Sequence, residues 1–405
     1  MTRGLDTEIG GRHTRRAMRA AAALVTLGLV AAACSGGDDD AGGQGGSGTD
    51  EAAATTVVPD GTVYPGADWE RADAAEMGFD PAKLEAIAGT AEAANSSCFV
   101  VTRKGEIVGE WYWDGADAET PREVFSVTKS ISSTLVGLAQ EDGDLKLTDP
   151  ASDYIPEWEG TDSAGVTVQN LVSNDSGREW SLALDYGDLI RAPDHTAFAV
   201  GLGQDAEPGT TWAYNNSAIQ TLDEVLHTAT GEQPADYAAS KLFEPIGMAH
   251  SEMTVDGADR TLTFMGLHTT CEDLARFGYL FLRHGSWDGT QVVPEGWVEA
   301  ATGDSSQELN AAYGYLWWLN RKGPLGSPTQ AVDGQAGGDQ ADGQMVPGAP
   351  EDMFWALGLQ NQIVAVDPGS ETVVVRIGGT PDEGQPAFTQ ADTAKVVTEA
   401  LTSSE

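Results

Sequence analysis

The chain has 405 residues, with 63 acidic and 22 basic side chains and a formal net charge of −41. This balance argues against nucleic-acid binding and against electrostatic attachment to anionic lipid, and it suits a solvated protein outside the cell. The length is too great for a small disulfide-stapled fold and is enough for a large core, in one bilobed domain or in two.

Residues 1–33 have the pattern of an export signal. Four arginines between positions 12 and 19 precede an apolar stretch, residues 20–33, that is too short for an ordinary membrane span. The stretch runs into Ala31-Ala32-Ala33-Cys34, which resembles a bacterial lipobox. It predicts a lipidated lipoprotein whose mature N-terminus is Cys34, anchored at the outer face of the bacterial cell membrane. The alternative is ordinary cleavage at an Ala-x-Ala site, with Cys34 incidental. The Sec and twin-arginine export routes both stay open.

Residues 34–68 are rich in Gly, Ser and Asp and predict a flexible tether, with an ordered domain over 69–405. Removal of residues 1–33, which hold five Arg and two acidic residues, leaves a net charge near −44. A helix is expected over 80–94, with Asp80 as its N-cap and proline at its first position. Residues 98–102 and 106–113 then predict two strands of a hairpin.

A Ser-x-x-Lys step follows the hairpin, where Phe125-Ser126-Val127-Thr128-Lys129 opens an apolar helical pattern. Positions i and i+3 share a helix face, so Ser126 and Lys129 can meet one turn apart. The helix N-terminus favours developing negative charge. A serine nucleophile needs a nearby base and a place for the oxyanion. The motif therefore predicts a catalytic serine with a lysine base, and no other lysine has Ser three residues before it.

Residues 126–285 predict a mainly helical insert, with helices at 219–228, 234–242 and 271–283. The insert contains the only Tyr-x-Asn of the chain, Tyr214-Asn215-Asn216. A tyrosine can relay a proton if an ammonium group stabilises its phenolate, and an asparagine amide can both donate and accept. Tyr214 is therefore predicted as a second proton carrier, and Asn216 as the amide that holds lysine and substrate together.

The end of the chain predicts three strands, 353–358, 362–366 and 372–377, and a closing helix at 392–401. With the hairpin, the five strands can form one antiparallel sheet flanked by helices. The predicted fold class is α/β (α+β): an α/β lobe from 69–125 and 286–405, and an inserted all-α lobe from 126–285. Sites tend to lie where lobes meet, so Ser126 and Gly358 are expected to face one cleft.

Ser-x-x-Lys followed by Tyr-x-Asn is the pattern of the serine β-lactamase and penicillin-binding superfamily, and residues 69–405 resemble that family. Two other stretches are similar to it, Pro245-Ile246-Gly247-Met248 and the helix at 272–278. The resemblance implies the serine β-lactamase-like fold, with Ser126 as nucleophile and Lys129 as base. It also implies Tyr214 as the second proton carrier and Asn216 as the bridging amide. No cofactor is expected.

The third motif of the family, a Lys-Thr-Gly strand, is matched here by Ala356-Leu357-Gly358, without a cation or hydroxyl group to hold a substrate carboxylate. The glycine still permits close approach of the backbone to the substrate. The resemblance implies an oxyanion hole from the N–H groups of Ser126 and Leu359. Family branches with a Gly-x-x-x-Gln segment at this place, here Gly358 to Gln362, resemble esterases and aminohexanoate-oligomer hydrolases more than lactamases. We therefore expect a hydrolase of small-molecule esters or linear amides.

Several alternatives stay open. The enzyme alternatives are a β-lactamase and a D-alanyl-D-alanine carboxypeptidase; the other class is a binding lipoprotein, either non-catalytic or a covalent sensor. Cys98 and Cys271 either form a disulfide, which export permits, or remain buried thiols. His268, Cys271 and Glu272 provide at most three ligands, so no metal site is predicted. The oligomeric state is left open.

Overall fold

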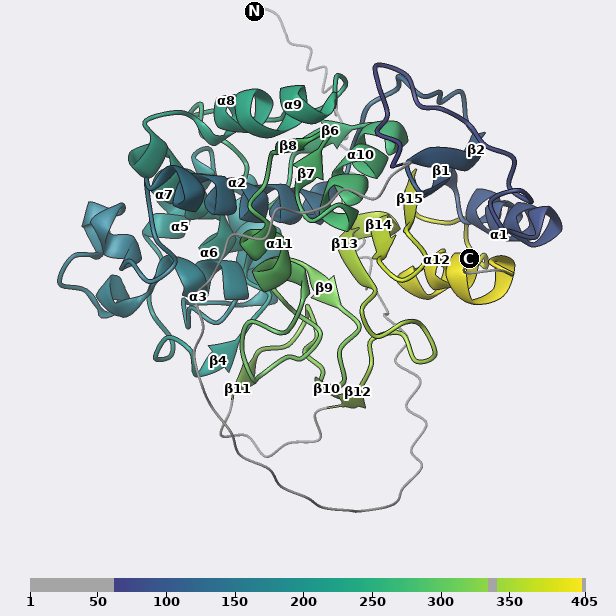
Figure 1. Cartoon of the computed structure of the whole chain (residues 1–405). Helices are drawn as coiled ribbons and strands as arrows, with labels where there is room; N and C mark the ends of the chain where they lie inside the picture. The colour runs from purple at the N-terminus through teal and green to yellow at the C-terminus, as the bar shows by residue number, and fades with distance from the viewer. Residues whose placement is uncertain (1–61, 334–340, 403–405) are drawn as a thin grey trace, which may run out of the picture. The chain divides into compact units, whose positions relative to one another are not determined.

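The computed structural model describes residues 62–333 and 341–402. Its main sheet is antiparallel, with strand order β2-β1-β15-β14-β13-β9 (Figure 1). The strands are β1 (Ser96–Arg103), β2 (Glu106–Tyr112), β9 (Trp318–Leu319), β13 (Phe354–Gly358), β14 (Gln362–Asp367) and β15 (Thr372–Gly378). The predicted fold class is confirmed. The sheet has six strands instead of five, because the short strand β9 at the end of an aromatic run pairs with Phe354 and Trp355.

The central strands are buried on both faces. Every residue of β1, β14 and β15 is buried, which agrees with the runs of valine and isoleucine in β14 and β15. Helix α10 (Cys271–Leu282) covers one face, and α1 (Pro81–Ala93) and α12 (Gln390–Lys395) cover the other (Figure 1). A Cβ at Gly278 of α10 would lie 2.6 Å from the Val373 side chain, so this glycine permits close packing of helix on sheet.

Helix α1 begins and ends within one residue of the predicted span. The Asp80 carboxylate accepts hydrogen bonds from the amides of Ala82 and Lys83, and proline follows it at the first position. The amide of Asp80 donates to the carbonyl of Ala400 at 2.8 Å. The beginning and the end of the folded chain therefore meet in the same α/β part, as predicted.

The insert is built around α2 (Thr128–Asp142), which is buried continuously from Thr128 to Ala139. The helices around it are α3 (Val168–Ser173), α4 (Leu189–Arg191), α5 (His195–Val200), α6 (Asn216–Gln220), α7 (Leu222–Thr230), α8 (Pro234–Ala238), α9 (Glu244–Ile246) and α11 (Glu295–Thr302). The helix predicted over 219–228 is thus two helices, α6 and α7, that meet at Thr221. The helix predicted over 234–242 is α8 followed by the π-helical turn η6 (Ala239–Phe243).

The insert is not purely helical, which corrects the prediction of an all-α lobe. Its strands β5 (Glu252–Met253) and β6 (Leu267–Thr269) form a small sheet with the order β3-β6-β5, in which β3 (Arg122–Glu123) comes from the segment just before the insert. These strands are two or three residues long, too short to show an alternating pattern in the sequence. Further two-stranded pairs are β4 (Thr211–Trp212) with β11 (Val332–Asp333), β7 (Ser286–Trp287) with β8 (Thr290–Gln291), and β10 (Gly323–Pro324) with β12 (Asp342–Gly343).

The segment before residue 69 is bound to the domain from at least Val63 onward. The Tyr279 hydroxyl donates to the Val63 carbonyl at 2.6 Å, and Arg276 donates to the carbonyls of residues 65–67. Tyr64 packs edge-on against Tyr279. The predicted end of the tether at residue 68 is therefore too late. Composition alone does not indicate that the backbone carbonyls before residue 69 are bound by side chains of α10. The predicted signal peptide, Cys34 and most of the tether lie outside the described residues. Within 62–333 and 341–402, we find no helix with the length and apolarity of a membrane span.

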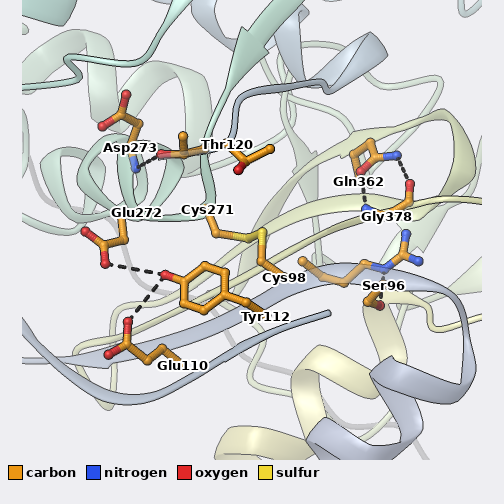
Figure 2. The surroundings of a disulfide bond; sticks show 12 residues. Ser96, Cys98, Glu110, Tyr112, Thr120, Cys271, Glu272, Asp273, Gln362 and Gly378 are labelled. Carbon is orange, nitrogen blue, oxygen red and sulfur yellow. Dashed lines mark hydrogen bonds between the residues drawn. A yellow bond between two sulfur atoms is a disulfide. The ribbon is translucent and has the colours of Figure 1, made fainter. Parts of the chain in front are cut away.

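Cys98 and Cys271 form a disulfide, one of the two alternatives left open by the sequence (Figure 2). It joins β1 to the first residue of α10, with 6.4 Å between the Cα atoms. Beside it, the Tyr112 hydroxyl lies between the carboxylates of Glu110 and Glu272, at 3.3 and 3.4 Å. The bond removes the Cys271 thiolate from the metal-ligand set considered above.

Replacing both cysteines by serine should lower the free energy of unfolding by about 2–5 kcal/mol, because the cross-link restricts the unfolded chain. The large separation, 173 residues, places the effect toward the upper end of that range. Urea unfolding of the double variant and of wild type, each with and without reductant, measures the loss. Reductant should destabilise wild type alone. Equal midpoints for wild type and variant under oxidising conditions would contradict the expectation.

Candidate active site

Ser126 lies on the 3₁₀ turn η1 (Phe125–Val127), directly before α2. The preceding Phe125 has φ +47°, a left-handed conformation that is unfavourable for a bulky residue and that concentrates at functional sites. The Thr128 hydroxyl fixes this turn, since it donates to the Phe125 carbonyl at 2.6 Å and accepts from the Leu267 amide at 3.0 Å. Ser126 is half-buried and Lys129 is buried, so the hydroxyl is open and the amine is enclosed.

Lys129 Nζ lies 2.8 Å from Ser126 Oγ and 2.8 Å from the carbonyl oxygen of Phe264. It also lies 4.8 Å from the centre of the Tyr214 ring. Burial lowers the pKa of Lys129 to about 7, although the negative charge of Asp185 opposes this shift. A large fraction of Lys129 is therefore a neutral amine at neutral pH, able to accept the serine proton.

Tyr214 follows β4 and precedes α6, and the Ser126 hydroxyl lowers the pKa of this phenol, against the larger effect of burial. Its ring stacks on Trp318 with 5.7 Å between the centroids. Burial raises the pKa of Tyr214 far above its ordinary value, so the group is a neutral phenol. This differs from the predicted phenolate beside an ammonium, because the Lys129 amine lies over the ring face. A phenol in this place can pass a proton in either direction.

Asn216, at the first position of α6, is buried and only partly hydrogen-bonded. Its side chain lowers the pKa of Tyr186, against the larger effect of burial, which raises it. Its Oδ1 atom has no hydrogen-bond partner in the described part of the chain, and the predicted bond to Lys129 is not formed there. A buried carbonyl oxygen left unpaired costs about 1–3 kcal/mol, so it is suited to accept an N–H group of a substrate.

Asp185 and Tyr186 lie beside these residues, and neither was predicted from the sequence. They lie on the π-helical turn η5 (Leu184–Asp188). The fully buried Asp185 carboxylate accepts from the amides of Asn216 and Ser217 at 2.6 and 3.2 Å. It also accepts from the Ser217 hydroxyl at 2.7 Å. Burial raises the pKa of Asp185 despite these bonds. An Asp-Tyr-Gly sequence is typical of an exposed loop, so no local signal indicates this role.

The loop after α3 supports the Tyr-x-Asn segment. The Asn174 side chain accepts from the Asn215 amide at 3.3 Å and donates to the Tyr313 hydroxyl at 3.1 Å. Arg178 in the same loop stacks on Trp158, with 4.2 Å between its guanidinium carbon and the ring centre. It donates to Ser163 and to the carbonyls of residues 199 and 200. Its guanidinium group is therefore bound within the insert, and burial lowers its pKa to about 10.

The strand predicted to bind substrate, β13, ends beside the serine turn. A Cβ at Gly358 would lie 2.3 Å from the Val124 carbonyl oxygen, so only glycine fits this approach. In the turn after it, Gln360 and Asn361 have φ values of +62° and +60°. The buried Arg376 of β15 donates to their carbonyls at 2.5 and 3.0 Å and so holds the turn that begins at Leu359. The contribution of Arg376 was not predicted.

A serine flanked by a buried neutral amine and a phenol, beside a glycine strand, defines a serine hydrolase of the β-lactamase and penicillin-binding fold. Residues 83–397 match the protein-family model described as Beta-lactamase, and the chain belongs to this family. It is similar to the 6-aminohexanoate-dimer hydrolase of Paenarthrobacter ureafaciens, with 23% identity over 80% of this chain and 84% of that protein. A D-aminopeptidase of Cereibacter sphaeroides is 25% identical over 51% of this chain and 43% of that protein.

Solved structures agree on the fold. The penicillin-binding protein homologue from Pyrococcus abyssi superposes with a TM-score of 0.60 at 18% identity, over 79% of this chain and 77% of that one. The family match, together with relatives named as a hydrolase and an aminopeptidase, confirms the predicted enzyme class.

Proposed function

We propose that this protein hydrolyses neutral esters or linear amides through an acyl-enzyme on Ser126, while tethered by lipid at Cys34 to the outer face of a bacterial membrane. The observation that carries the catalytic part is the 2.8 Å approach of Ser126 Oγ and a buried Lys129 amine. The names of the relatives support linear amides as substrates, since a 6-aminohexanoate-dimer hydrolase and a D-aminopeptidase are among them.

The geometry supports a two-step mechanism. Neutral Lys129 takes the proton of Ser126 as Oγ attacks the carbonyl carbon, and the N–H groups of Ser126 and Leu359 stabilise the oxyanion. Tyr214 passes the proton to the leaving oxygen or nitrogen as the carbonyl bond to that atom breaks. Water then attacks the acyl-enzyme, losing its proton to the same pair, and the serine hydroxyl is restored as the acid leaves. Asn216 Oδ1 can hold an amide N–H of the substrate during both steps.

The preference for neutral substrates follows from the apolar side chains of β13. Ala356 and Leu357 offer no partner for a carboxylate, and Arg178 is engaged by Trp158 and Ser163. A charge-assisted hydrogen bond contributes about 1.5–3 kcal/mol, so its loss should cost roughly 10–100-fold in kcat/KM for anionic substrates. The strongly negative chain adds repulsion at long range.

A neutral p-nitrophenyl ester should therefore have a higher kcat/KM than nitrocefin. Both rates are measured on the same preparation, and the Ser126→Ala variant corrects for background hydrolysis. If nitrocefin is the better substrate by tenfold or more, the β-lactamase alternative replaces this proposal. A probe that reacts with active-site serines distinguishes the enzyme from the binding lipoprotein of the other class. Labelling without turnover indicates a covalent sensor, and failure to label indicates a binding protein.

Replacing Cys34 by alanine should move the protein from the membrane fraction to the soluble fraction, with kcat/KM of the released protein unchanged. The reason is that lipid on Cys34 would be the only membrane attachment once residues 1–33 are removed. Fractionation of cells that produce either form, with immunoblotting, measures the shift. Cys98→Ser is the matched cysteine control and should stay with the membrane. Continued sedimentation of Cys34→Ala would mean that residues 20–33 remain as an uncleaved anchor.

A further inference from the structure

An apolar stripe runs along the turn that carries Asp185 and Tyr186. Large hydrophobic side chains that are exposed in the described residues are Leu182, Tyr186, Ile190, Val255 and Leu359. Three of them follow each other at intervals of four, with exposed fractions of 43%, 48% and 43% for residues 182, 186 and 190. Residues four apart share a helix face. These three residues form one face, which we call the 182–190 stripe.

The opposite side of this turn is fastened to the catalytic centre. Asp185 and Leu189, also four residues apart, are both fully buried. Asp185 binds the amides at the start of α6, as described above. Just before the turn, the Trp180 indole N–H donates to the Tyr214 carbonyl at 3.0 Å. The turn cannot rotate to bury the stripe without breaking these bonds, so the apolar side chains stay exposed.

The stripe borders the site. Tyr186, at its middle, directly follows Asp185, whose carboxylate accepts hydrogen bonds from the amides of Asn216 and Ser217, two and three residues after Tyr214. Across the serine turn, the exposed Leu359 follows Gly358, so a second apolar side chain lies on the β13 side.

We propose that the 182–190 stripe binds the hydrocarbon chain of the substrate and selects n-alkyl esters or amides of medium chain length. This inference rests on the proposed function and specifies its substrate class. At the α-helical rise of about 1.5 Å per residue the stripe would span about 12 Å, and its π-helical part makes it somewhat shorter, which is still the scale of one alkyl chain. Three side chains are too few for a stable protein interface of about 800 Å² per partner. The net charge of −41 disfavours an anionic lipid surface as the occupant.

The expected signature is a rise in kcat/KM with chain length. Full burial of a methylene group increases affinity about fourfold. A methylene group that the stripe covers on one side only should increase it roughly twofold. The increase from two to eight carbons, six methylene groups, should then be about 60-fold. Replacing Leu182 and Ile190 by serine should reduce the ratio between eight- and two-carbon substrates by at least about fivefold, because the stripe then loses most of its apolar area.

The test uses two ester series: acetates of n-alcohols and ethyl esters of n-alkanoic acids, each from two to eight carbons. Proton release at constant pH gives kcat/KM for wild type, Leu182→Ser/Ile190→Ser and the control Val255→Ser, which removes an exposed apolar side chain outside the stripe. We expect the ratio to fall in at least one series for the double variant and to stay at the wild-type value for the control. Ile190→Thr replaces the double variant if the latter does not fold.

Two failures are distinguishable. If hydrolysis depends on Ser126 but the ratio of kcat/KM between eight- and two-carbon substrates is the same in wild type and the folded variant, the stripe proposal fails and the proposed function stands. Loss of vesicle binding or of self-association in the variant, with an unchanged ratio, also overturns the stripe proposal and identifies the other occupant. If no ester in either series is hydrolysed in a Ser126-dependent manner, the proposed function fails and the stripe proposal with it.

Discussion

Replacing Ser126 by alanine should lower kcat/KM by about 10³- to 10⁶-fold, since the variant keeps binding and oxyanion groups but loses the nucleophile. The exposure of the hydroxyl beside a buried amine is the structural basis for this expectation. Steady-state hydrolysis of a p-nitrophenyl ester measures the loss. A fluorophosphonate probe followed by peptide mass spectrometry should place the adduct on residue 126 in wild type.

The exposed Ser240 on η6 supplies a matched control. Ser240→Ala should hydrolyse the ester at the wild-type rate and take up the probe fully. The two serine variants thus separate loss of the nucleophile from a general effect of removing a hydroxyl group. Wild-type turnover by Ser126→Ala would remove this residue from the mechanism altogether.

Replacing Lys129 by arginine should also abolish most activity, because a guanidinium group stays protonated and cannot accept the serine proton. Wild-type kcat/KM should fall about tenfold for each pH unit below about 6, since protonation of an amine with a pKa of about 7 removes the base. Because the neutral amine is the reactive form, kcat/KM increases as pH rises through the pKa of Lys129. Rate profiles from pH 5 to 9 test both statements.

Lys241→Arg is the control, because Lys241 is largely exposed and pairs with Asp142 at the surface. It should keep the wild-type rate and pH profile. If Lys129→Arg acylates normally, the base is another group, with Tyr214 as the first candidate. An acid limb that stays near pH 7 in that variant would point to the same conclusion.

The order of the main elements could be predicted, because it depends on patterns within short windows. Valine-rich strands and the Asp80-Pro81 start of α1 appear in the sequence as they do in the structure. The family and the enzyme class followed from two short motifs, Ser126 with Lys129 and Tyr214 with Asn216. Each motif joins residues that lie within four positions of one another, so their spacing is itself informative.

The parts that were missed depend on contacts between distant segments. Asp185 accepts a hydrogen bond from the backbone amide of Asn216, 31 residues away. Arg376 donates one to the carbonyl of Gln360, 16 residues away. Neither residue belongs to a local pattern. The limit of the tether was misplaced for the same reason, since Tyr279 lies 216 residues beyond Val63. Such side chains gain their roles only when the helical insert and the sheet have closed around them.

The position of β1 in the sheet has a consequence for the newly made chain. Arg103, at the end of β1, pairs with Thr372, at the start of β15, so one hydrogen-bonding edge of β1 stays open until residue 372 and those after it have been synthesised. Contacts this distant along the chain form slowly, and an open strand edge can pair with other molecules. A ribosome that stops before residue 372 would release a product with an incomplete sheet, prone to aggregate. Strand β1 therefore completes its place in the sheet only after residues 372–378 have been made, although it pairs with β2 much earlier.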